Sequence, residues 1–302
     1  MGKIAFVFSG QGDQFPGMGK ELAGQYECAR AVFDMCDQIR PGTSAQCFEG
    51  TEEELKETKN TQPCLFAMEL AAASVLKEAG IVPQAVAGFS LGEVAACTFA
   101  GILDDRTGFQ LVLRRGELMQ EASEKQDTAM AAVVKLTPEQ VEEICGKYGN
   151  IYPVNYNCPG QISVAGLSEE MPAFFAEVKA AGGRALPLKV KGAFHSPFMK
   201  GASEAFAREL ERVEIHRNQI TLYSNLTARP YGEDVKMLLS EQISGPVRWE
   251  NTIRNMIDEG IDTFIEIGPG KTLTNMIRKI SAEVRTYSVS DLSQVLSEVK
   301  PC

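Results

Sequence analysis

The chain has few of the residues from which metal sites and disulfide frameworks are built. Its 302 residues include only two histidines, His195 and His216, and its eight cysteines contain no Cys-x-x-Cys pair. Because structural metal sites draw several ligands from these residue types, no bound metal is expected. The cysteines are expected to be reduced thiols, most of them packed in the interior.

Long apolar runs and an excess of positive charge are missing too. No run approaches the ~20 residues that span a bilayer, and the strand-like residues 4–8 follow the N-terminus without a signal peptide. We therefore expect a cytoplasmic protein that does not contact a membrane. The formal net charge of −10 argues against nucleic acid as a partner.

The composition that remains, 44% hydrophobic and 23% charged, is typical of a globular protein. A chain of this length favours one main domain with a smaller one inserted or appended. Strand-like segments alternate with helical patterns, which indicates a parallel sheet. The expected strands are 4–8, 85–89, 220–224, 263–267 and 284–288, and the expected helices are 27–40, 64–79, 105–122, 201–211, 234–243 and 250–259.

The middle of the chain has a different pattern. Strand-like segments at 129–134, 151–154, 161–165 and 184–188 are separated by helical stretches at 138–146 and 168–181. This β-α-β-β-α-β order is that of the ferredoxin-like split unit. Its length suits an inserted subdomain.

Residues 88–92 read Gly-Phe-Ser-Leu-Gly and lie between an apolar strand and a helical pattern. A Gly-x-Ser-x-Gly in that position is typical of a nucleophile elbow, a sharp turn that exposes the serine hydroxyl. The glycines allow strained backbone angles and close approach of strand and helix. Ser90 is therefore the predicted nucleophile.

A serine nucleophile needs a base, and the chain offers two histidines. His216 lies in a polar stretch that is typical of a solvated connector. His195 lies in an apolar loop, bounded by glycine and proline, directly after an expected strand. A lone histidine in such a loop is often a core residue, but next to a serine elbow His195 is the predicted base.

Six segments resemble the malonyl-CoA:acyl carrier protein transacylases, in the order of that family and over nearly the whole chain. The resemblance implies an α/β-hydrolase-like parallel-sheet core formed by residues 1–126 and 190–302, with a ferredoxin-like α+β subdomain inserted at 127–189. The segments are residues 10–14 (Gly-Gln-Gly-Asp-Gln), 88–93, 114–120, 155–161 (Asn-Tyr-Asn-Cys-Pro-Gly-Gln), 193–196 (Ala-Phe-His-Ser), and Gln242 with Pro246-Val247-Arg248-Trp249.

The resemblance implies ping-pong transfer of a malonyl group between two thioesters, with malonyl-CoA as a substrate and no cofactor. Ser90 carries the malonyl ester, and His195 takes its proton and returns it to the leaving thiol. Gln242 stands where the family orients the histidine through a carbonyl oxygen. The backbone N–H groups of Gln11 and Leu91 form the implied oxyanion hole.

Arg115 is the implied specificity residue. A guanidinium can grip the free carboxylate of malonyl, which acetyl lacks. Its neighbour Arg114 lies 100° away around the helix and is expected in solvent. Phe194 resembles the bulky residue that leaves no room for methylmalonyl. Met119 is expected as an apolar wall of the pocket, or equally as core filler.

The implied partner is an acidic acyl carrier protein. Asn155 and Asn157 alternate along a strand, so both are expected to face the site and to bind pantetheine or hold nearby loops. Lys189, Lys191 and Lys200 lie in a stretch without carboxylates and are candidates for docking the carrier. A monomer is expected.

Two positions depart from the family pattern. Phe89 stands where the family usually has histidine, which removes any role for a second imidazole. Asp13 adds a negative charge near the oxyanion loop, so its side chain should point away or be satisfied locally. Glu93 follows the elbow and is expected to interact with the helix dipole.

Three alternatives stay open. A stand-alone acyltransferase that serves a polyketide synthase would carry the same residues. A serine esterase or thioesterase would need a third acid between serine and histidine and a histidine near the C-terminus. A non-catalytic binding module would tolerate loss of Ser90 or His195, and both are present.

Overall fold

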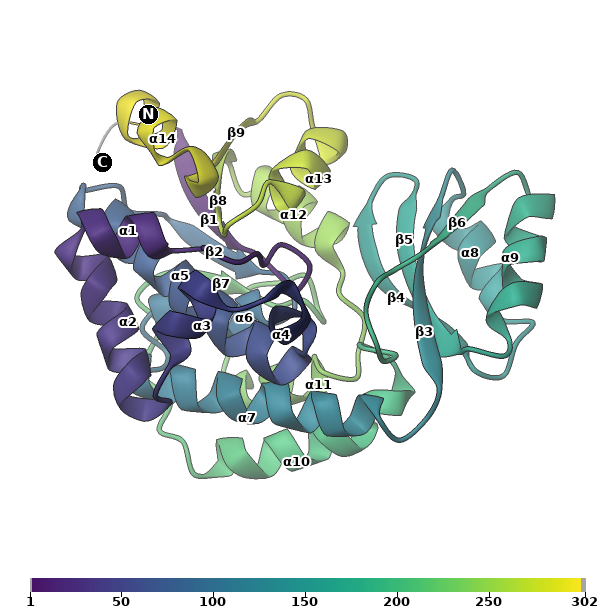
Figure 1. Cartoon of the computed structure of the whole chain (residues 1–302). Helices are drawn as coiled ribbons and strands as arrows, with labels where there is room; N and C mark the ends of the chain where they lie inside the picture. The colour runs from purple at the N-terminus through teal and green to yellow at the C-terminus, as the bar shows by residue number, and fades with distance from the viewer. Residues whose placement is uncertain (1, 300–302) are drawn as a thin grey trace.

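The larger lobe of the molecule is built on a parallel sheet (Figure 1). The computed structural model describes residues 2–299. Five strands lie in the order β7-β2-β1-β8-β9, and every neighbouring pair is parallel. They are β1 (Lys3–Phe8), β2 (Ala85–Gly88), β7 (Thr221–Tyr223), β8 (Ile261–Ile267) and β9 (Arg285–Ser288).

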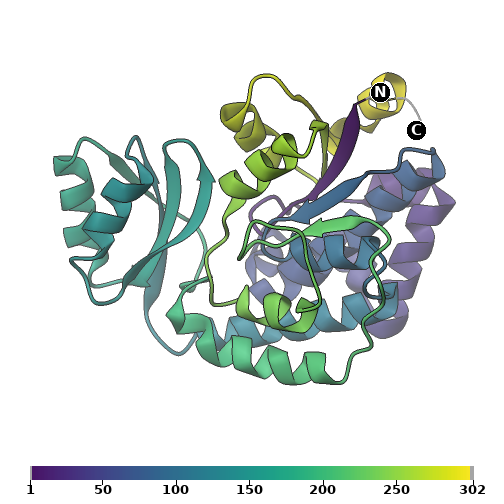
Figure 2. The same cartoon turned by 180° about the vertical axis from the view of Figure 1, so that it is seen from behind.

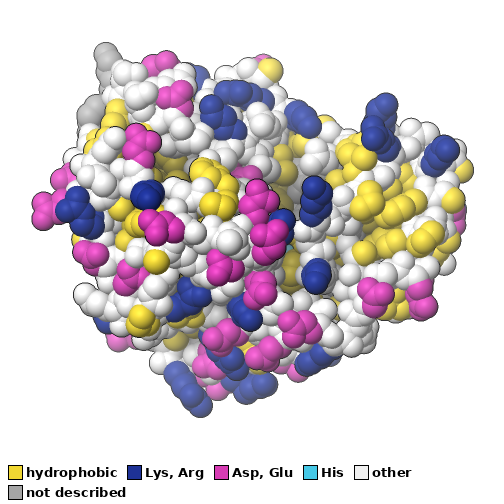
Figure 3. Space-filling model, in the orientation of Figure 1, with side chains coloured by type: hydrophobic (Ala, Val, Ile, Leu, Met, Phe, Trp, Pro, Cys, Tyr) yellow, Lys and Arg dark blue, Asp and Glu magenta, His cyan; other side chains and the backbone are white. Residues whose placement is uncertain are grey.

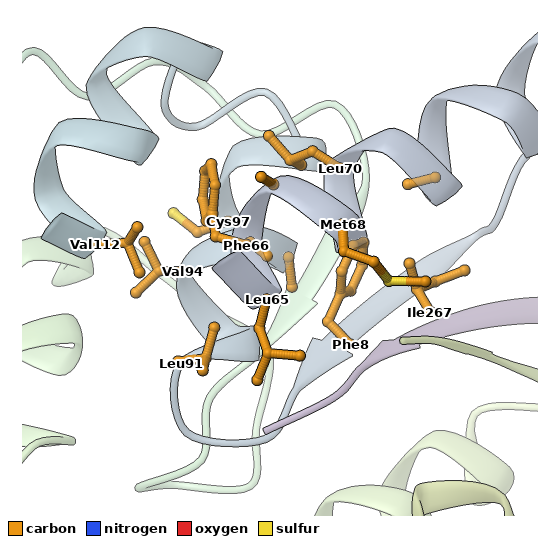
Figure 4. Packing of buried hydrophobic residues seen from close by; sticks show 14 of the residues in the cluster. Phe8, Leu65, Phe66, Met68, Leu70, Leu91, Val94, Cys97, Val112 and Ile267 are labelled. Carbon is orange, nitrogen blue, oxygen red and sulfur yellow. The ribbon is translucent and has the colours of Figure 1, made fainter. Parts of the chain in front are cut away.

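Helices cover both faces of this sheet because the central strand is apolar on both sides. Phe6 and Phe8 point into one cluster, whereas Ala5 and Val7 point into another. The first cluster, part of which is drawn in Figure 4, takes in helices α1 (Lys20–Gln25), α2 (Glu27–Ile39), α3 (Thr43–Glu49), α4 (Glu52–Lys56), α5 (Thr58–Glu78), α6 (Gly92–Phe99), α7 (Asp105–Ser123), α10 (Lys200–Glu211), α11 (Val235–Glu241) and α14 (Leu292–Glu298). The second takes in α12 (Trp249–Asp258) and α13 (Thr272–Ile280).

A smaller lobe holds an antiparallel sheet in the order β4-β5-β3-β6, with two helices on its outer side (Figure 1). This strand order is the one that a ferredoxin-like split unit produces. Its elements are β3 (Thr128–Val134), α8 (Pro138–Cys145), β4 (Ile151–Cys158), β5 (Gln161–Leu167), α9 (Met171–Ala180) and β6 (Arg184–Pro187).

The two lobes are joined by backbone hydrogen bonds at one edge of the small sheet. Val247 donates its N–H to the carbonyl of Val154 (2.8 Å) and accepts from the N–H of Tyr156 (2.9 Å). Figure 2 shows this connection from behind, where the segment between α11 and α12 runs beside the small sheet. Gln11 and Phe89, which follow the carboxyl ends of β1 and β2, line a cavity together with Asn155 and Asn157 of the small lobe.

The fold class expected from the sequence is confirmed, a parallel-sheet core with an inserted ferredoxin-like α+β subdomain. The domain boundaries at 127 and 189 stay a prediction. Within residues 2–299, no helix combines the length and the apolar character needed to cross a membrane.

Two expected boundaries are wrong by four residues or more. The strand expected at 151–154 continues to Cys158, and the helix expected from 64 begins at Thr58, with Pro63 inside it. The helix begins six residues earlier than expected, where the side chain of Gln120 accepts the N–H of Thr58 (2.9 Å) and so provides a long-range partner for a donor of the first turn.

Candidate active site

Ser90 lies in a strained turn between β2 and α6. Its φ of 57° is in the left-handed region, and the side chain of Asn225 accepts its backbone N–H (2.8 Å). A Cβ at Gly88 would lie 1.9 Å from the carbonyl carbon of Gly92, and one at Gly92 would lie 2.3 Å from the carbonyl oxygen of Ser9. Both glycines are therefore required by close backbone approach, as in a nucleophile elbow.

His195 reaches Ser90 from the loop that returns from the small lobe. Its Nε2 lies 2.8 Å from Ser90 Oγ, and its Nδ1 lies 2.8 Å from the backbone carbonyl of Gln242. Because that carbonyl can only accept, Nδ1 carries the proton and Nε2 presents a lone pair to the serine. Burial, reinforced by the charge of Arg115, lowers the pKa of His195 to about 4. The imidazole is thus neutral at pH 7 and able to take a proton.

Two backbone N–H groups are available beside Ser90. Gln11 and Leu91 line the same cavity as Ser90 and His195. Within residues 2–299, nothing accepts a hydrogen bond from the backbone N–H of either residue. One lies in a glycine loop and the other at the start of α6, where free N–H groups favour negative charge. The pair can therefore stabilise a developing oxyanion.

Arg115 is fully buried in α7 and points at the same serine. One guanidinium nitrogen donates to Gln62 Oε1 (2.8 Å), and the other donates to Gln242 Oε1 (2.7 Å) and lies 3.3 Å from Ser90 Oγ. Its Nε has no hydrogen-bond partner among the described residues. Burial lowers the pKa of Arg115 to about 10, so the group is still charged at pH 7. Arg114 instead lies at the surface and pairs with Glu117 and Glu209.

The cavity over Ser90 is small, about 90 Å³. Met119 and Phe194 form part of its wall, and both are buried. Gln62 donates to the Met119 sulfur (3.4 Å), which links this wall to Arg115. The cavity therefore offers room for a short acyl group beside the Ser90 hydroxyl, which itself lies 3.3 Å from the Arg115 guanidinium.

A second cavity of about 250 Å³ adjoins the first and is lined by Asn155 and Asn157. Gln11 and Phe89 line both cavities. The side-chain oxygens of both asparagines are buried without a hydrogen-bond partner among the described residues. These orphaned acceptors suit a ligand that carries amide N–H groups, since an unmade hydrogen bond is costly inside a protein.

A third, outer cavity of about 450 Å³ lies where the loop after β6 passes the N-terminal part of the chain. Lys56 and Lys189 line it, and Phe15 beside them is 47% exposed. Lys191 and Lys200 are exposed as well. Figure 3 shows basic side chains along the junction of the two lobes.

The two departures from the family pattern are accommodated locally. Phe89 packs edge-on against Trp249, with ring centroids 5.6 Å apart. Asp13 accepts a hydrogen bond from the Thr272 hydroxyl. Burial raises the pKa of Asp13, and that hydrogen bond opposes the rise. The exposed His216 lies near Glu214, away from the serine.

Sequence reasoning missed several polar residues behind the site. Gln62 holds Arg115, Asn225 holds Ser90, and Tyr231 donates to the buried Glu93 (2.7 Å). Asn225 follows the carboxyl end of β7, and sites of parallel sheets gather at such strand ends. That position is the one signal that could have identified it.

Comparison with known proteins gives matches over almost the whole chain. The family model described as "Acyl transferase domain" matches residues 5–295. The malonyl CoA-acyl carrier protein transacylase of Bacillus subtilis is 41% identical over 300 residues, 96% of this chain and 94% of that protein. The enzyme of the same name from Escherichia coli is 33% identical, with 97% of each chain covered.

Solved structures agree with these matches. A malonyl CoA-acyl carrier protein transacylase from Clostridium perfringens superposes with a TM-score of 0.95 at 36% identity, covering 98% of this chain and 97% of that one. A malonyl transacylase in complex with its type II polyketide acyl carrier protein gives a TM-score of 0.94 at 34% identity, with 98% of each chain covered.

Proposed function

Since this chain belongs to the malonyl CoA-acyl carrier protein transacylases, within the acyl transferase domain family, we propose that it transfers the malonyl group of malonyl-CoA to the phosphopantetheine thiol of an acyl carrier protein. One observation supports this most: a buried guanidinium lies 3.3 Å from the hydroxyl of a serine that is hydrogen-bonded to a neutral histidine.

The first half-reaction acylates the enzyme. Ser90 Oγ attacks the thioester carbonyl carbon while its proton passes to His195 Nε2. The oxyanion that forms accepts hydrogen bonds from the N–H groups of Gln11 and Leu91. The carbon–sulfur bond then breaks, and His195 returns the proton to the departing coenzyme A thiolate. Malonyl remains as an ester on Ser90.

The second half-reaction reverses these roles. The carrier thiol gives its proton to His195 and attacks the same carbonyl carbon. Collapse of the tetrahedral intermediate breaks the bond to Ser90 Oγ, which recovers its proton from His195. The backbone carbonyl of Gln242 holds the imidazole in one tautomer throughout, so the catalytic pair is a Ser-His dyad.

Substrate choice rests on Arg115 in this proposal. Its Nε, which has no hydrogen-bond partner among the described residues, is available to the malonyl carboxylate. The nitrogen nearest Ser90 can exchange its contact with Ser90 Oγ for the same carboxylate once the serine is acylated, and Met119 and Phe194 limit the size of the acyl group. The orphaned acceptors of Asn155 and Asn157 suit the amide N–H groups of pantetheine. No cofactor is needed for these steps.

The partner we propose is an acidic acyl carrier protein that docks at Lys189, Lys191 and Lys200. A related transacylase has been solved with its polyketide carrier, so a polyketide carrier is the second candidate beside that of fatty acid synthesis. An esterase is disfavoured because His195 Nδ1 meets a backbone carbonyl and not a carboxylate. We propose further that the protein is a cytoplasmic monomer.

The acyl-enzyme provides the test. After brief incubation with equal malonyl-CoA, methylmalonyl-CoA and acetyl-CoA, intact-mass and peptide spectra should show a malonyl adduct on the Ser90 peptide and little of the other two. Ser90→Ala, with the same fold by circular dichroism, should carry none. A malonyl adduct that survives in Ser90→Ala would rule out the proposed nucleophile.

A further inference from the structure

Gln242 contacts three parts of the site with three different polar groups. Its backbone carbonyl accepts from His195 Nδ1 (2.8 Å), and its side-chain oxygen accepts from Arg115 (2.7 Å). Its side-chain nitrogen donates to the backbone carbonyl of Ser90 (2.6 Å). The base, the cation and the nucleophile thus share one neighbour.

Glu93 lies directly behind Gln242 and is fully buried. One carboxylate oxygen accepts from the Gln242 side-chain nitrogen (2.8 Å). The other accepts from the Tyr231 hydroxyl (2.7 Å) and from the backbone N–H of Asn225 (3.0 Å). Asn225 in turn accepts the N–H of Ser90 (2.8 Å). Glu93 is therefore linked to His195, Arg115 and Ser90 through a single intervening residue, either Gln242 or Asn225.

The side-chain amide of Gln242 can adopt two orientations, which differ by exchange of its oxygen and its nitrogen. An amide has a donor end and an acceptor end of nearly the same shape, and either can occupy a given place. Glu93, when ionised, can only accept, and Arg115 can only donate. Together with the Ser90 carbonyl, which also only accepts, they select the orientation in which the Gln242 oxygen meets the guanidinium.

We propose that Glu93 is a positioning residue for the malonyl transfer. Its carboxylate fixes the Gln242 amide, and through it the place of the Arg115 guanidinium beside Ser90. Glu93 also supplies the negative charge that balances the buried Arg115, which lies beyond the intervening amide. This role rests on the proposed function, since it matters only for an acyl group that carries a carboxylate.

Glu93→Gln is the direct test, because it keeps the shape and removes the charge. A glutamine that accepts from Tyr231 and Asn225 presents its own NH₂ to the NH₂ of Gln242. The Ser90 carbonyl and Arg115 still oppose reversal of the Gln242 amide, so the two NH₂ groups repel each other and the Gln242 side chain shifts away from its place beside Arg115. Loss of a hydrogen bond to a charged group corresponds to about 10- to 100-fold. We expect kcat/KM for malonyl-CoA to fall by about that factor and kcat/KM for acetyl-CoA to fall about 3-fold or less.

Glu69→Gln is the matched control. Glu69 is also fully buried, accepts from the Ser9 hydroxyl (2.7 Å) and has one oxygen without a partner among the described residues. Burial raises the pKa of Glu69 well above the ordinary value. The pKa of Glu93 is raised only to about 7, because its hydrogen bonds oppose the effect of burial, so Glu93 is ionised at the assay pH of 8. Glu69→Gln should leave the malonyl-to-acetyl ratio unchanged.

A double variant keeps the test decisive if Glu93→Gln does not fold. In the double variant Glu93→Gln/Gln242→Glu, the amide is at position 93 and the carboxylate at position 242. The hydrogen bond between the two side chains can still form with its donor and acceptor exchanged, and a carboxylate lies next to Arg115. Its malonyl-to-acetyl ratio should exceed that of Gln242→Glu alone, in which two carboxylates face each other. Folding is checked by circular dichroism and thermal melting for every variant.

The outcomes separate the two proposals. If the wild-type chain forms no malonyl ester on Ser90, the proposed function fails. If it does, and Glu93→Gln keeps the wild-type ratio or loses both substrates equally, the role of Glu93 is wrong. A double variant that is no more selective than Gln242→Glu would overturn it as well.

Discussion

At the scale of single residues, burial decides which of two adjacent arginines can do chemistry. Arg114 and Arg115 follow each other in α7, and a helix turns 100° between them. Arg114 meets water and two glutamates at the surface. Arg115 is fully buried among neutral acceptors. Glu93 balances this charge only from behind the Gln242 amide, and the Nε of Arg115 has no partner among the described residues, so Arg115 can still bind a carboxylate directly.

This contrast predicts a large effect of alanine substitution at Arg115 and almost none at Arg114. Arg115→Ala should lower kcat/KM for malonyl transfer by about 30-fold or more, because a charge-assisted hydrogen bond to the substrate is lost. Acetyl transfer should change by about 3-fold or less. Arg114→Ala, one residue away, should leave both within about 2-fold. Steady-state assays with the two CoA esters measure the ratios.

If Arg115→Ala lowered kcat/KM for malonyl-CoA and acetyl-CoA equally, Arg115 would not recognise the malonyl carboxylate. The thermal stability of this variant should be measured alongside, since the truncation leaves the side-chain oxygens of Gln62 and Gln242 without this donor.

The site residues that sequence could supply are those carried by short motifs. Ser90 and His195 follow from an elbow and a count of histidines, and Arg115 follows from the resemblance. The roles of Gln62 and Asn225 could not be predicted, because no short motif connects them to the residues they bind. Gln62 is 53 residues from Arg115 in the sequence, and Asn225 is 135 residues from Ser90. Only the folded backbone brings such partners together.

At the scale of elements, local pattern predicted the strands and long helices better than the short ones. The expected strands 263–267 and 284–288 correspond to β8 and β9. Helix α13 was not expected, and its first turn is capped from a distance, since the Glu266 carboxylate in β8 accepts the N–H groups of Leu273 and Thr274 (3.0 and 2.7 Å). A cap supplied by a strand side chain carries no local signal at the helix start.

The elbow is an element whose sequence requirement is steric and can be tested. Gly92→Ala places a methyl group 2.3 Å from the Ser9 carbonyl oxygen, so either β1 or α6 must move. Overpacking of this kind costs about 3 kcal/mol. Gly24→Ala in α1 meets nothing within 4 Å and should stabilise the fold by about 0.5–1 kcal/mol.

Urea unfolding followed by circular dichroism measures both changes. If Gly92→Ala unfolds at the wild-type urea concentration, the close approach of α6 to β1 is not required for stability. Acylation of Ser90 in Gly92→Ala should also be slower under conditions in which the variant is folded, because the close contact between Gly92 and Ser9 holds the strained turn that carries Ser90.

At the scale of the whole molecule, the reactive groups come together only where the two lobes meet. Ser90 and Arg115 belong to the larger lobe, Asn155 and Asn157 to the smaller, and His195 to the segment that returns between them. The same returning segment carries Lys189 and Lys191 at the surface. The proposed entrance for a pantetheine arm and the proposed docking surface for its carrier are thus continuous.

Because the docking surface is basic and the proposed carrier is acidic, we expect salt to weaken binding of the carrier. Complementary charge steers encounter and is screened within about 10 Å at 0.1 M salt. For the wild-type chain, KM for the acyl carrier protein should rise several-fold between 0.05 and 0.3 M NaCl, on the order expected for a few surface charges. Lys189→Glu should raise KM for the carrier about 3- to 10-fold at low salt and flatten this dependence.

Lys179→Glu is the matched control, since it makes the same charge change at the end of α9, on the outer side of the small lobe (Figure 1). It should leave KM for the carrier near the wild-type value. The rate of Ser90 acylation by malonyl-CoA, followed by rapid quench and mass spectrometry, separates carrier docking from binding of the anionic CoA. A salt-independent KM for the carrier, or equal effects of Lys189→Glu and Lys179→Glu, would place the docking surface elsewhere on the molecule.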